Sequence, residues 1–195
     1  MTKMYFAENP DAKHDIHKLK VELLGQQMTF LTDAGVFSKK MIDYGSRVLL
    51  SALEFNKKEM LLDVGCGYGT LGLTLAKAQE LEVTLVDINQ RALDLARKNA
   101  DANQVSADIF QSNVYENVTG QFHHIISNPP IRAGKQVVHE VISGSYDHLL
   151  ADGDLTIVIQ KKQGAPSAKT KMEEVFGNCE TLKKDKGYYI LRSVK

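Results

Sequence analysis

The 195-residue chain lacks tryptophan and contains only two cysteines and four prolines. Cys66 and Cys179 lie far apart and form no Cys-x-x-Cys pair, which argues against a disulfide framework and a structural zinc site. No apolar run reaches the roughly 18 residues of a membrane span, and the acidic first segment has no signal-like apolar core. We therefore expect a cytoplasmic globular protein with no membrane contact and no metal.

An excess of charge of one sign is also lacking, because 24 basic residues balance 24 acidic ones. The charges are unevenly distributed along the chain: residues 60–159 are net acidic, whereas residues 160–195 are net basic. A basic C-terminal edge can meet a phosphate backbone locally, but it cannot give the salt-driven affinity of a strongly basic protein. A solvated, lysine-rich surface is the alternative interpretation of this edge.

The length predicts one compact domain with a small appendage, and the apolar pattern predicts an α/β fold. Two hairpin signals flank the central alternation of strands and helices, one at 19–32 around Gly25-Gln26 and one at 179–193 around Asp185-Lys186-Gly187. We expect the first hairpin to pack on the main sheet and the second to end that sheet with antiparallel strands. Between them, strands are expected at 60–64, 82–87, 107–111, 122–127 and 154–160, and helices at 70–79, 89–103 and 137–150.

A glycine-rich turn, Gly65-Cys66-Gly67-Tyr68-Gly69, follows the first of these strands and opens a helix. Glycines permit positive φ and let a ligand approach the backbone, although a tight turn without a ligand is the alternative. Asp87 ends the next strand, where a carboxylate can accept hydrogen bonds from ribose hydroxyls. Asp63, just before the glycines, would repel a pyrophosphate but attract the positive sulfonium and ammonium groups of S-adenosylmethionine. The pattern therefore favours this methyl donor over NAD.

An Asn128-Pro129-Pro130 turn ends the fourth strand, at the sheet edge that should also carry Gly65 and Asp87. Proline has no N–H group, and Pro129 holds Asn128 in an extended conformation. The turn therefore presents acceptors, namely the Asn128 side-chain oxygen and a neighbouring carbonyl. Such acceptors suit a planar exocyclic NH2 group and favour the positive charge that develops as its nitrogen attacks a methyl group. A rigid structural turn is the alternative.

Other polar residues near these motifs have simpler interpretations. Asn113 follows the third strand, where its amide could bind the adenine edge or form a turn. Arg132 and Lys135 are interpreted as contacts to substrate phosphates, with an exposed basic turn as the alternative. His123 and His124 have no neighbouring cysteine or acidic residue in the sequence, so a metal role is not expected.

Taken together, these residues resemble the class I S-adenosylmethionine-dependent methyltransferases. They are more similar still to the RsmC-like guanine-N2 methyltransferases of small-subunit ribosomal RNA, in a single-domain form. The resemblance implies a Rossmann-like fold with a mostly parallel seven-stranded sheet, an antiparallel last strand and a small N-terminal β-hairpin. It is carried by Gly35-Val36-Phe37-Ser38, Asp43-Tyr44-Gly45-Ser46-Arg47, Asp63-Val64-Gly65-Cys66-Gly67, Ser112-Asn113 and Ser127-Asn128-Pro129-Pro130.

The resemblance also implies a division of the chain and a set of roles. Residues 1–45 form the hairpin and a segment that closes over the cofactor, and residues 46–195 form the methyltransferase domain. The catalytic residues are Asn128, Pro129 and Pro130, and the substrate contacts are Arg132, Lys135, Lys161 and Lys162. S-adenosylmethionine is the cofactor, and its expected contacts are Phe37, Gly45, Asp63, Gly65, Cys66, Gly67, Gly69, Asp87, Ile88 and Asn113.

One departure from the family pattern concerns the target base. Related amino-methyltransferases often carry an aromatic residue after the second proline, where it stacks on the base, but this chain has Ile131. Phe37 and Tyr146 are candidate substitutes. The chain shows no second methyltransferase-like half of the kind found in longer members, so we expect substrate docking through Lys161-Lys162 and the basic C-terminal edge.

The expected function is methyl transfer to the exocyclic N2 amine of a guanine in 16S ribosomal RNA, with the target base turned out of its stack. The expected partner is ribosomal RNA or the small ribosomal subunit, and the expected state is a monomer or weak homodimer. Two other acceptors present a planar NH2 group: adenine N6 and a protein glutamine amide. A non-catalytic RNA-binding module and an NAD-dependent oxidoreductase are the alternatives from other classes.

Overall fold

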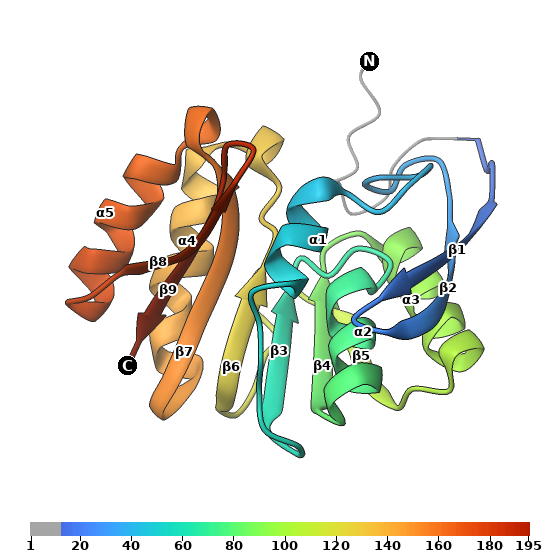
Figure 1. Ribbon diagram of the computed structural model, residues 1–195, viewed down its shortest axis with the longest axis horizontal. Helices are drawn as coiled ribbons and strands as arrows, with labels where there is room; N and C mark the ends of the chain where they lie inside the picture. The colour runs from blue at the N-terminus through green and yellow to red at the C-terminus, as the bar shows by residue number, and fades with distance from the viewer. Residues whose placement is uncertain (1–12) are drawn as a thin grey trace.

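The computed structural model describes residues 13–195 and shows one central sheet flanked by helices (Figure 1). The strand order in the seven-stranded sheet is β5-β4-β3-β6-β7-β9-β8. In chain order, with η marking a short 3-10 helix, the elements are β1 (His17–Leu23), β2 (Gln26–Thr32), α1 (Tyr44–Leu50), β3 (Met60–Val64), α2 (Thr70–Gln79), β4 (Glu82–Asp87), α3 (Gln90–Asn103), β5 (Ala107–Gln111), β6 (Phe122–Ser127), η1 (Ile131–Ala133), α4 (Lys135–Ser145), η2 (Tyr146–His148), β7 (Leu149–Gln160), η3 (Lys161–Gln163), α5 (Ala165–Phe176), β8 (Glu180–Asp185) and β9 (Tyr188–Val194).

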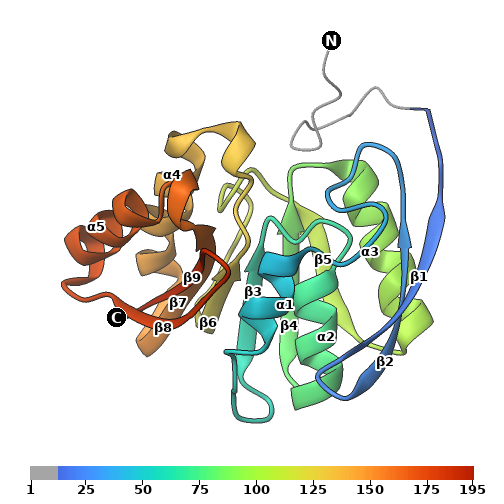
Figure 2. The same cartoon turned by 45° about the horizontal axis from the view of Figure 1, so that its top comes forward.

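The sheet is parallel from β5 to β7, and β9 runs antiparallel to its neighbours β7 and β8. Helices α1, α2 and α3 cover one face, whereas α4 and α5 cover the other (Figures 1 and 2). Each face has its own core, and consecutive strand residues contribute to opposite cores: Leu61 belongs to one and Leu62 to the other. The expected α/β fold with a mostly parallel seven-stranded sheet and an antiparallel last strand is confirmed.

The predicted helix at 137–150 and the predicted strand at 154–160 have wrong boundaries. Helix α4 ends at Ser145, the chain tightens into η2, and β7 begins at Leu149. Leu149 is fully buried and pairs with Phe122 of β6, so tertiary packing decides its conformation. Position 153 of β7 requires glycine, because a Cβ there would lie within 3.1 Å of backbone oxygens. With glycine the strand continues past this point without a clash.

The N-terminal hairpin is present, but the expectation that it packs on the main sheet is wrong. Strands β1 and β2 form a separate two-stranded sheet that lies against α3 and α2. The Asn103 side-chain oxygen accepts from the Thr29 N–H at 2.9 Å, and Asn99 bonds both the N–H and the C=O of Leu31. Helix side chains therefore satisfy the free edge of β2 and fix where the following residues 33–38 can lie.

His124 of β6 has no acidic neighbour in the sequence, but the fold brings two carboxylates from distant positions to its ring. Its Nδ1 contacts the Asp154 carboxylate on β7, and its Nε2 lies 2.9 Å from the Glu59 carboxylate before β3. Burial alone would lower the pKa of His124, but these two carboxylates outweigh burial and raise it. Because carboxylates only accept hydrogen bonds, these two contacts favour the positively charged ring, which has a hydrogen on both nitrogens.

Replacing His124 by glutamine is expected to destabilise the protein by about 2 kcal/mol near pH 6, as for the loss of charge-assisted hydrogen bonds. A raised histidine pKa stabilises the fold fully below the unfolded value of about 6.5, and this stabilisation is lost as pH rises through the folded value. The deficit should therefore shrink toward pH 9. Urea titrations of both proteins from pH 5.5 to 9 measure it, with His148→Gln as control because His148 contacts the Gly120 carbonyl oxygen. A deficit that stays constant with pH would contradict the charged state.

Within residues 13–195, no helix is both long enough and apolar enough to cross a membrane.

Candidate functional site

A cavity of about 670 Å³ opens at the carboxyl ends of the central strands. Its volume falls within the usual range for small-molecule sites. Gly65 comes from the end of β3, Asp87 from β4, Asn113 from the segment after β5 and Asn128 from the end of β6. The sequence-based expectation that these residues share one edge of the sheet agrees with this geometry.

The glycine turn follows β3, lines the cavity and is hydrogen-bonded to the neighbouring strand β4. Gly65 and Gly67 have φ of +73° and +57°, and a Cβ on either would meet no atom within 4 Å. These glycines thus expose backbone to open space where a side chain would intrude on a ligand. The Asp87 carboxylate accepts from the Gly67 N–H at 2.8 Å, and the Val86 carbonyl oxygen accepts from the N–H groups of Gly65 and Cys66. The turn is therefore held on β4 by one carboxylate and one carbonyl group.

Asp63 lies behind this turn and does not line the cavity, although it was expected among the cofactor contacts. Its side chain is fully buried, and its Oδ2 accepts from the Gly72 N–H at 2.9 Å. Its Oδ1 is buried without a hydrogen-bond partner among the described residues. Burial, together with the nearby Asp87, raises the pKa of Asp63 to about 7. Such a carboxyl group gains a stable charge when a cation binds nearby, which suits a sulfonium and an ammonium group.

The Asn128 amide is clamped by the start of α1. Its Nδ2 donates to the Asp43 carboxylate and to the Ser46 hydroxyl oxygen, both at 3.0 Å. The same Asp43 oxygen accepts from the Ser46 N–H at 3.0 Å and so caps α1. Since a carboxylate can only accept, it fixes which end of the amide faces α1. The Asn128 side-chain oxygen therefore turns the other way, as an oriented acceptor beside the cavity.

Gly45 lets α1 approach the C-terminal hairpin closely. A Cβ at this position would lie 2.8 Å from the Tyr188 ring and 2.9 Å from the Asp43 carboxylate. Gly45 is buried and does not itself line the cavity, whereas Asp43, Ser46 and Tyr188 do. Its contribution is thus to bring these three side chains together.

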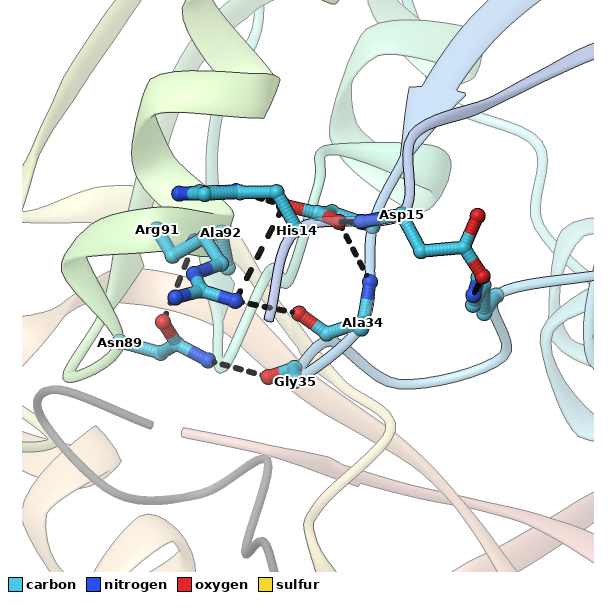
Figure 3. A network of polar contacts seen from close by, with 9 residues as sticks. His14, Asp15, Ala34, Gly35, Asn89, Arg91 and Ala92 are labelled. Carbon is cyan, nitrogen blue, oxygen red and sulfur yellow. Dashed lines mark hydrogen bonds and ion pairs between the residues drawn. The ribbon is translucent and has the colours of Figure 1, made fainter. Parts of the chain in front are cut away.

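Residues 33–38 cover the other side of the cavity and are tied to the start of α3 (Figure 3). The Asn89 amide nitrogen donates to the Gly35 carbonyl oxygen at 3.0 Å, and Arg91 donates to the Ala34 carbonyl oxygen at 2.8 Å. Asp33, which is almost fully buried, accepts from the Ala34 N–H. These bonds hold Phe37, which is 39% exposed, at the cavity wall next to the glycine turn.

The other residues expected at the site either line the cavity or lie outside it. Cys66 lines the cavity, and burial raises its pKa well above the usual value, as for a space-filling thiol and not a nucleophile. Tyr146 lies in η2 before the start of β7 and packs against Phe176, so the suggestion that it stacks on the base is wrong. The residues expected at the site are thus distributed as follows: Phe37, Gly65, Cys66, Gly67, Asp87, Ile88, Asn113, Asn128, Pro129 and Pro130 line the cavity, whereas Gly45, Asp63, Gly69, Lys135, Lys161 and Lys162 do not.

The lysines expected to bind substrate are close in the chain to residues that line the cavity. Lys135 begins α4, and Lys161 and Lys162 form η3 directly after Gln160, which lines the cavity. All three lysines are exposed. Arg132 falls within η1, but its side chain lies outside the described part of the structure.

Sequence reasoning from the residues alone missed several cavity residues. Asp43 and Ser46 entered only through the family resemblance, since the seven-residue helix α1 was not predicted. Asn89, an N-cap residue before α3, carried a capping signal that could have been noticed. No sequence signal pointed to Tyr188, which reaches the cavity from the other end of the sheet. Across residues 13–195, no three His, Cys, Asp or Glu side chains are grouped so as to hold a metal ion.

Comparisons with known proteins agree with this geometry. Residues 27–192 match the family model described as methyltransferase small domain. The chain is 44% identical to the uncharacterized protein YbxB of Bacillus subtilis over the whole of both chains. It is 37% identical to ribosomal RNA small subunit methyltransferase C of Erwinia tasmaniensis, over 87% of this chain and 50% of the relative.

A solved structure is similar as well. The T. thermophilus 16S rRNA N2 methyltransferase RsmC, in complex with AdoMet and guanosine, superposes with a TM-score of 0.86 at 29% identity. The match covers 95% of this chain and 52% of that one. The chain thus spans about half the length of the ribosomal RNA methyltransferases it matches, and the full length of the Bacillus protein.

Proposed function

The chain belongs to the methyltransferase small domain family, and on that premise we propose that it methylates the exocyclic N2 amine of a guanine in small-subunit ribosomal RNA. S-adenosylmethionine is the methyl donor. The names of the relatives support an RNA substrate, since one methylates small-subunit ribosomal RNA and another was solved with guanosine. The proposed partner is therefore ribosomal RNA or the small ribosomal subunit.

The observation that carries the proposal is the orientation of the Asn128 amide. Asp43 and Ser46 hold its nitrogen, so its oxygen is available to a donor in the cavity. An exocyclic amine has two hydrogens, and Asn128 Oδ1 with a carbonyl oxygen of the Asn128-Pro129 turn can accept both. Acceptors fixed before the reaction stabilise the positive charge that grows on the amine nitrogen.

The cofactor contacts are assigned to the cavity residues at the ends of β3, β4 and β5. S-adenosylmethionine supplies a methyl group on a positively charged sulfur. The open backbone at Gly65 and Gly67 accommodates its methionine part, the Asp87 carboxylate accepts from the ribose hydroxyls, and Asn113 contacts the adenine. Asp63 is buried behind the glycine turn, and its negative charge attracts the sulfonium and ammonium groups of the cofactor. Phe37 closes over the bound molecule.

Positioning supplies most of the rate in this mechanism. Holding the amine nitrogen in line with the methyl group can contribute about 7–11 kcal/mol. The nitrogen forms a bond to the methyl carbon as the carbon–sulfur bond breaks, and the nitrogen then releases a proton to water. Asn128 orients the amine throughout, and no ionised general base is required beforehand. Lys135, Lys161 and Lys162 bind phosphates around the target nucleotide.

Binding of S-adenosylmethionine is expected to tighten about 10-fold between pH 5.5 and pH 8. The pKa of Asp63 is about 7, so its carboxyl group is neutral at the lower pH and charged at the higher one. The charged form attracts the sulfonium and ammonium groups. Calorimetric titration of wild type and Asp63→Asn measures the effect, and the variant should show a flatter profile. Equal profiles would show that the charge of Asp63 does not affect binding of S-adenosylmethionine.

The proposed function is tested by mapping methylated nucleotides in ribosomal RNA. In cells that lack the protein, one guanine of 16S ribosomal RNA should lose its N2 methyl group, and the wild-type gene should restore it. Mass spectrometry of nuclease digests identifies both the nucleotide and the methylated atom. A lost methyl on adenine N6 or on a protein glutamine would replace the guanine assignment, and unchanged methylation with intact RNA binding would indicate a non-catalytic module.

A further inference from the structure

Three aromatic side chains line the cavity among the described residues: Phe37, Tyr68 and Tyr188. We propose that Tyr188 is the residue that stacks on the target base, in the role that the aromatic residue after the second proline has in related enzymes. The inference deepens the proposed function and rests on it. It is carried by the place of Tyr188 in the sheet and by its fixed distance from the Asn128 clamp.

Strand order separates the cavity into a donor side and an acceptor side. Strands β5, β4 and β3 carry the glycine turn, Asp87 and Asn113, and β6 carries Asn128 at the boundary. Beyond β6 come β7 and then β9, whose first residue is Tyr188. If the target amine lies between the methyl donor and Asn128, the rest of its base must extend away from the donor. The ring of the base then points toward β7 and β9. Tyr188 lies on that side of the cavity.

The other two aromatic residues belong to the donor side. Phe37 is part of the segment that Asn89 and Arg91 tie to the start of α3. Tyr68 belongs to the glycine turn, is only 4% exposed and donates its hydroxyl to the Ser38 carbonyl oxygen. Ile131, after the second proline, lines the cavity but offers no ring.

The Tyr188 ring is held rigidly beside the amine clamp. The point at which a Gly45 Cβ would lie is 2.8 Å from the Tyr188 ring and 2.9 Å from the Asp43 oxygen that holds Asn128. Tyr44 packs against Tyr188 with ring centroids 5.6 Å apart. The Tyr44 hydroxyl donates to Asp185 at 2.9 Å, which joins α1 to the same hairpin. A ring fixed in this way suits stacking, because little conformational freedom is lost when the base arrives.

The surroundings of Tyr188 fit a nucleotide. Gln160, the register partner of Tyr188 on β7, also lines the cavity. Lys161 follows it, and the Lys161 N–H donates to the Gly187 carbonyl oxygen at 2.8 Å, so η3 and the hairpin lie together. Lys186 lies with its Nζ 5.0 Å from the centre of the Tyr44 ring. Two lysines therefore belong to the segments next to Tyr188, where they can meet the phosphates of a turned-out nucleotide.

The absence of tryptophan from the chain allows a direct test of stacking. Tyr188→Trp introduces a single indole at the proposed position, and a stacked guanine should quench its fluorescence. We expect guanosine 5′-monophosphate to quench this indole in protein saturated with S-adenosylhomocysteine. Tyr189→Trp is the matched control, because Tyr189 belongs to the core on the opposite face of the sheet. Equal quenching in both variants, or none at position 188, would overturn the proposal.

Activity provides a second readout. Tyr188→Leu should lower kcat/KM for small ribosomal subunits about 10-fold to 100-fold, as for the loss of one base–aromatic contact, with unchanged affinity for S-adenosylhomocysteine. Tyr188→Phe keeps the ring and should stay within about threefold of wild type, which shows that the hairpin still folds. Phe37→Leu should weaken S-adenosylhomocysteine instead. Two results together would assign the stacking role to Phe37. Adding Phe37→Leu to Tyr188→Trp would abolish the quenching, and Tyr188→Leu alone would leave kcat/KM unchanged. Methylation of some other acceptor by the wild type would instead refute the proposed function.

Discussion

Replacing Asn128 by alanine is expected to lower turnover by about 100-fold or more while S-adenosylhomocysteine binds with unchanged affinity. The substitution removes the oriented oxygen that we propose as the acceptor for the target amine. It also leaves Asp43 and Ser46 without the nitrogen that they hold. Because the glycine turn and Asp87 lie on the neighbouring strands β3 and β4, the donor side of the cavity stays intact.

The measurement combines single-turnover methylation of ribosomal RNA with calorimetric titration of S-adenosylhomocysteine. Asn117→Ala is the matched control, since the Asn117 amide donates to the Gln111 carbonyl oxygen and does not line the cavity. Its turnover should equal that of the wild type. If Asn128→Ala retained full turnover, the amine clamp would have to be assigned elsewhere, and the guanine assignment would lose its main support.

Replacing Asp87 by alanine should have the second largest effect, a loss of about 100-fold in affinity for S-adenosylmethionine. Two contributions add up to this loss. The carboxylate accepts from the Gly67 and Asn89 N–H groups at 2.8 Å, so it fixes the glycine turn in addition to its proposed contact with the ribose. Hydrogen bonds to a charged group are each worth about 1.5–3 kcal/mol, and 1.4 kcal/mol corresponds to a factor of ten in affinity.

Calorimetry again provides the measurement, with two companion variants. Asp87→Asn keeps the size of the side chain and one acceptor, so its loss should be smaller than that of Asp87→Ala. Asp94→Ala removes an exposed carboxylate of α3 that pairs with Arg97, and its affinity should match the wild type. Unchanged affinity in Asp87→Ala would show that the ribose is bound elsewhere.

The sequence predicts the parallel part of the fold well because local signals and tertiary packing agree there. Strands β3, β4, β5 and β6 and helix α2 have the predicted bounds. Agreement is lost where packing overrides local pattern, as at Leu149, whose burial against Phe122 favours a strand over a helix. The short helix α1 has too few turns for a periodic signal, so its seven residues were not recognised as a helix.

The site was predictable where its residues stand at the carboxyl ends of strands that the sequence indicates. Gly65, Asp87 and Asn128 each follow a recognisable strand, and parallel strands bring their carboxyl ends to one edge. Asp43 and Tyr188 are different, because their positions depend on the insertion of β9 between β7 and β8 and on the close approach at Gly45. His124 shows the same limit, since its two carboxylate partners come from positions 59 and 154.

The tether on the Asn128 amide has a consequence for discrimination between nucleobases. A free asparagine can flip and serve either a donor or an acceptor, but Asp43 prevents this rotation. A keto oxygen brought to this position would meet another oxygen and be repelled. If the proposed function holds, the pocket should distinguish the N2 edge of guanine from its O6 edge, and it should not methylate inosine, which lacks the N2 amino group.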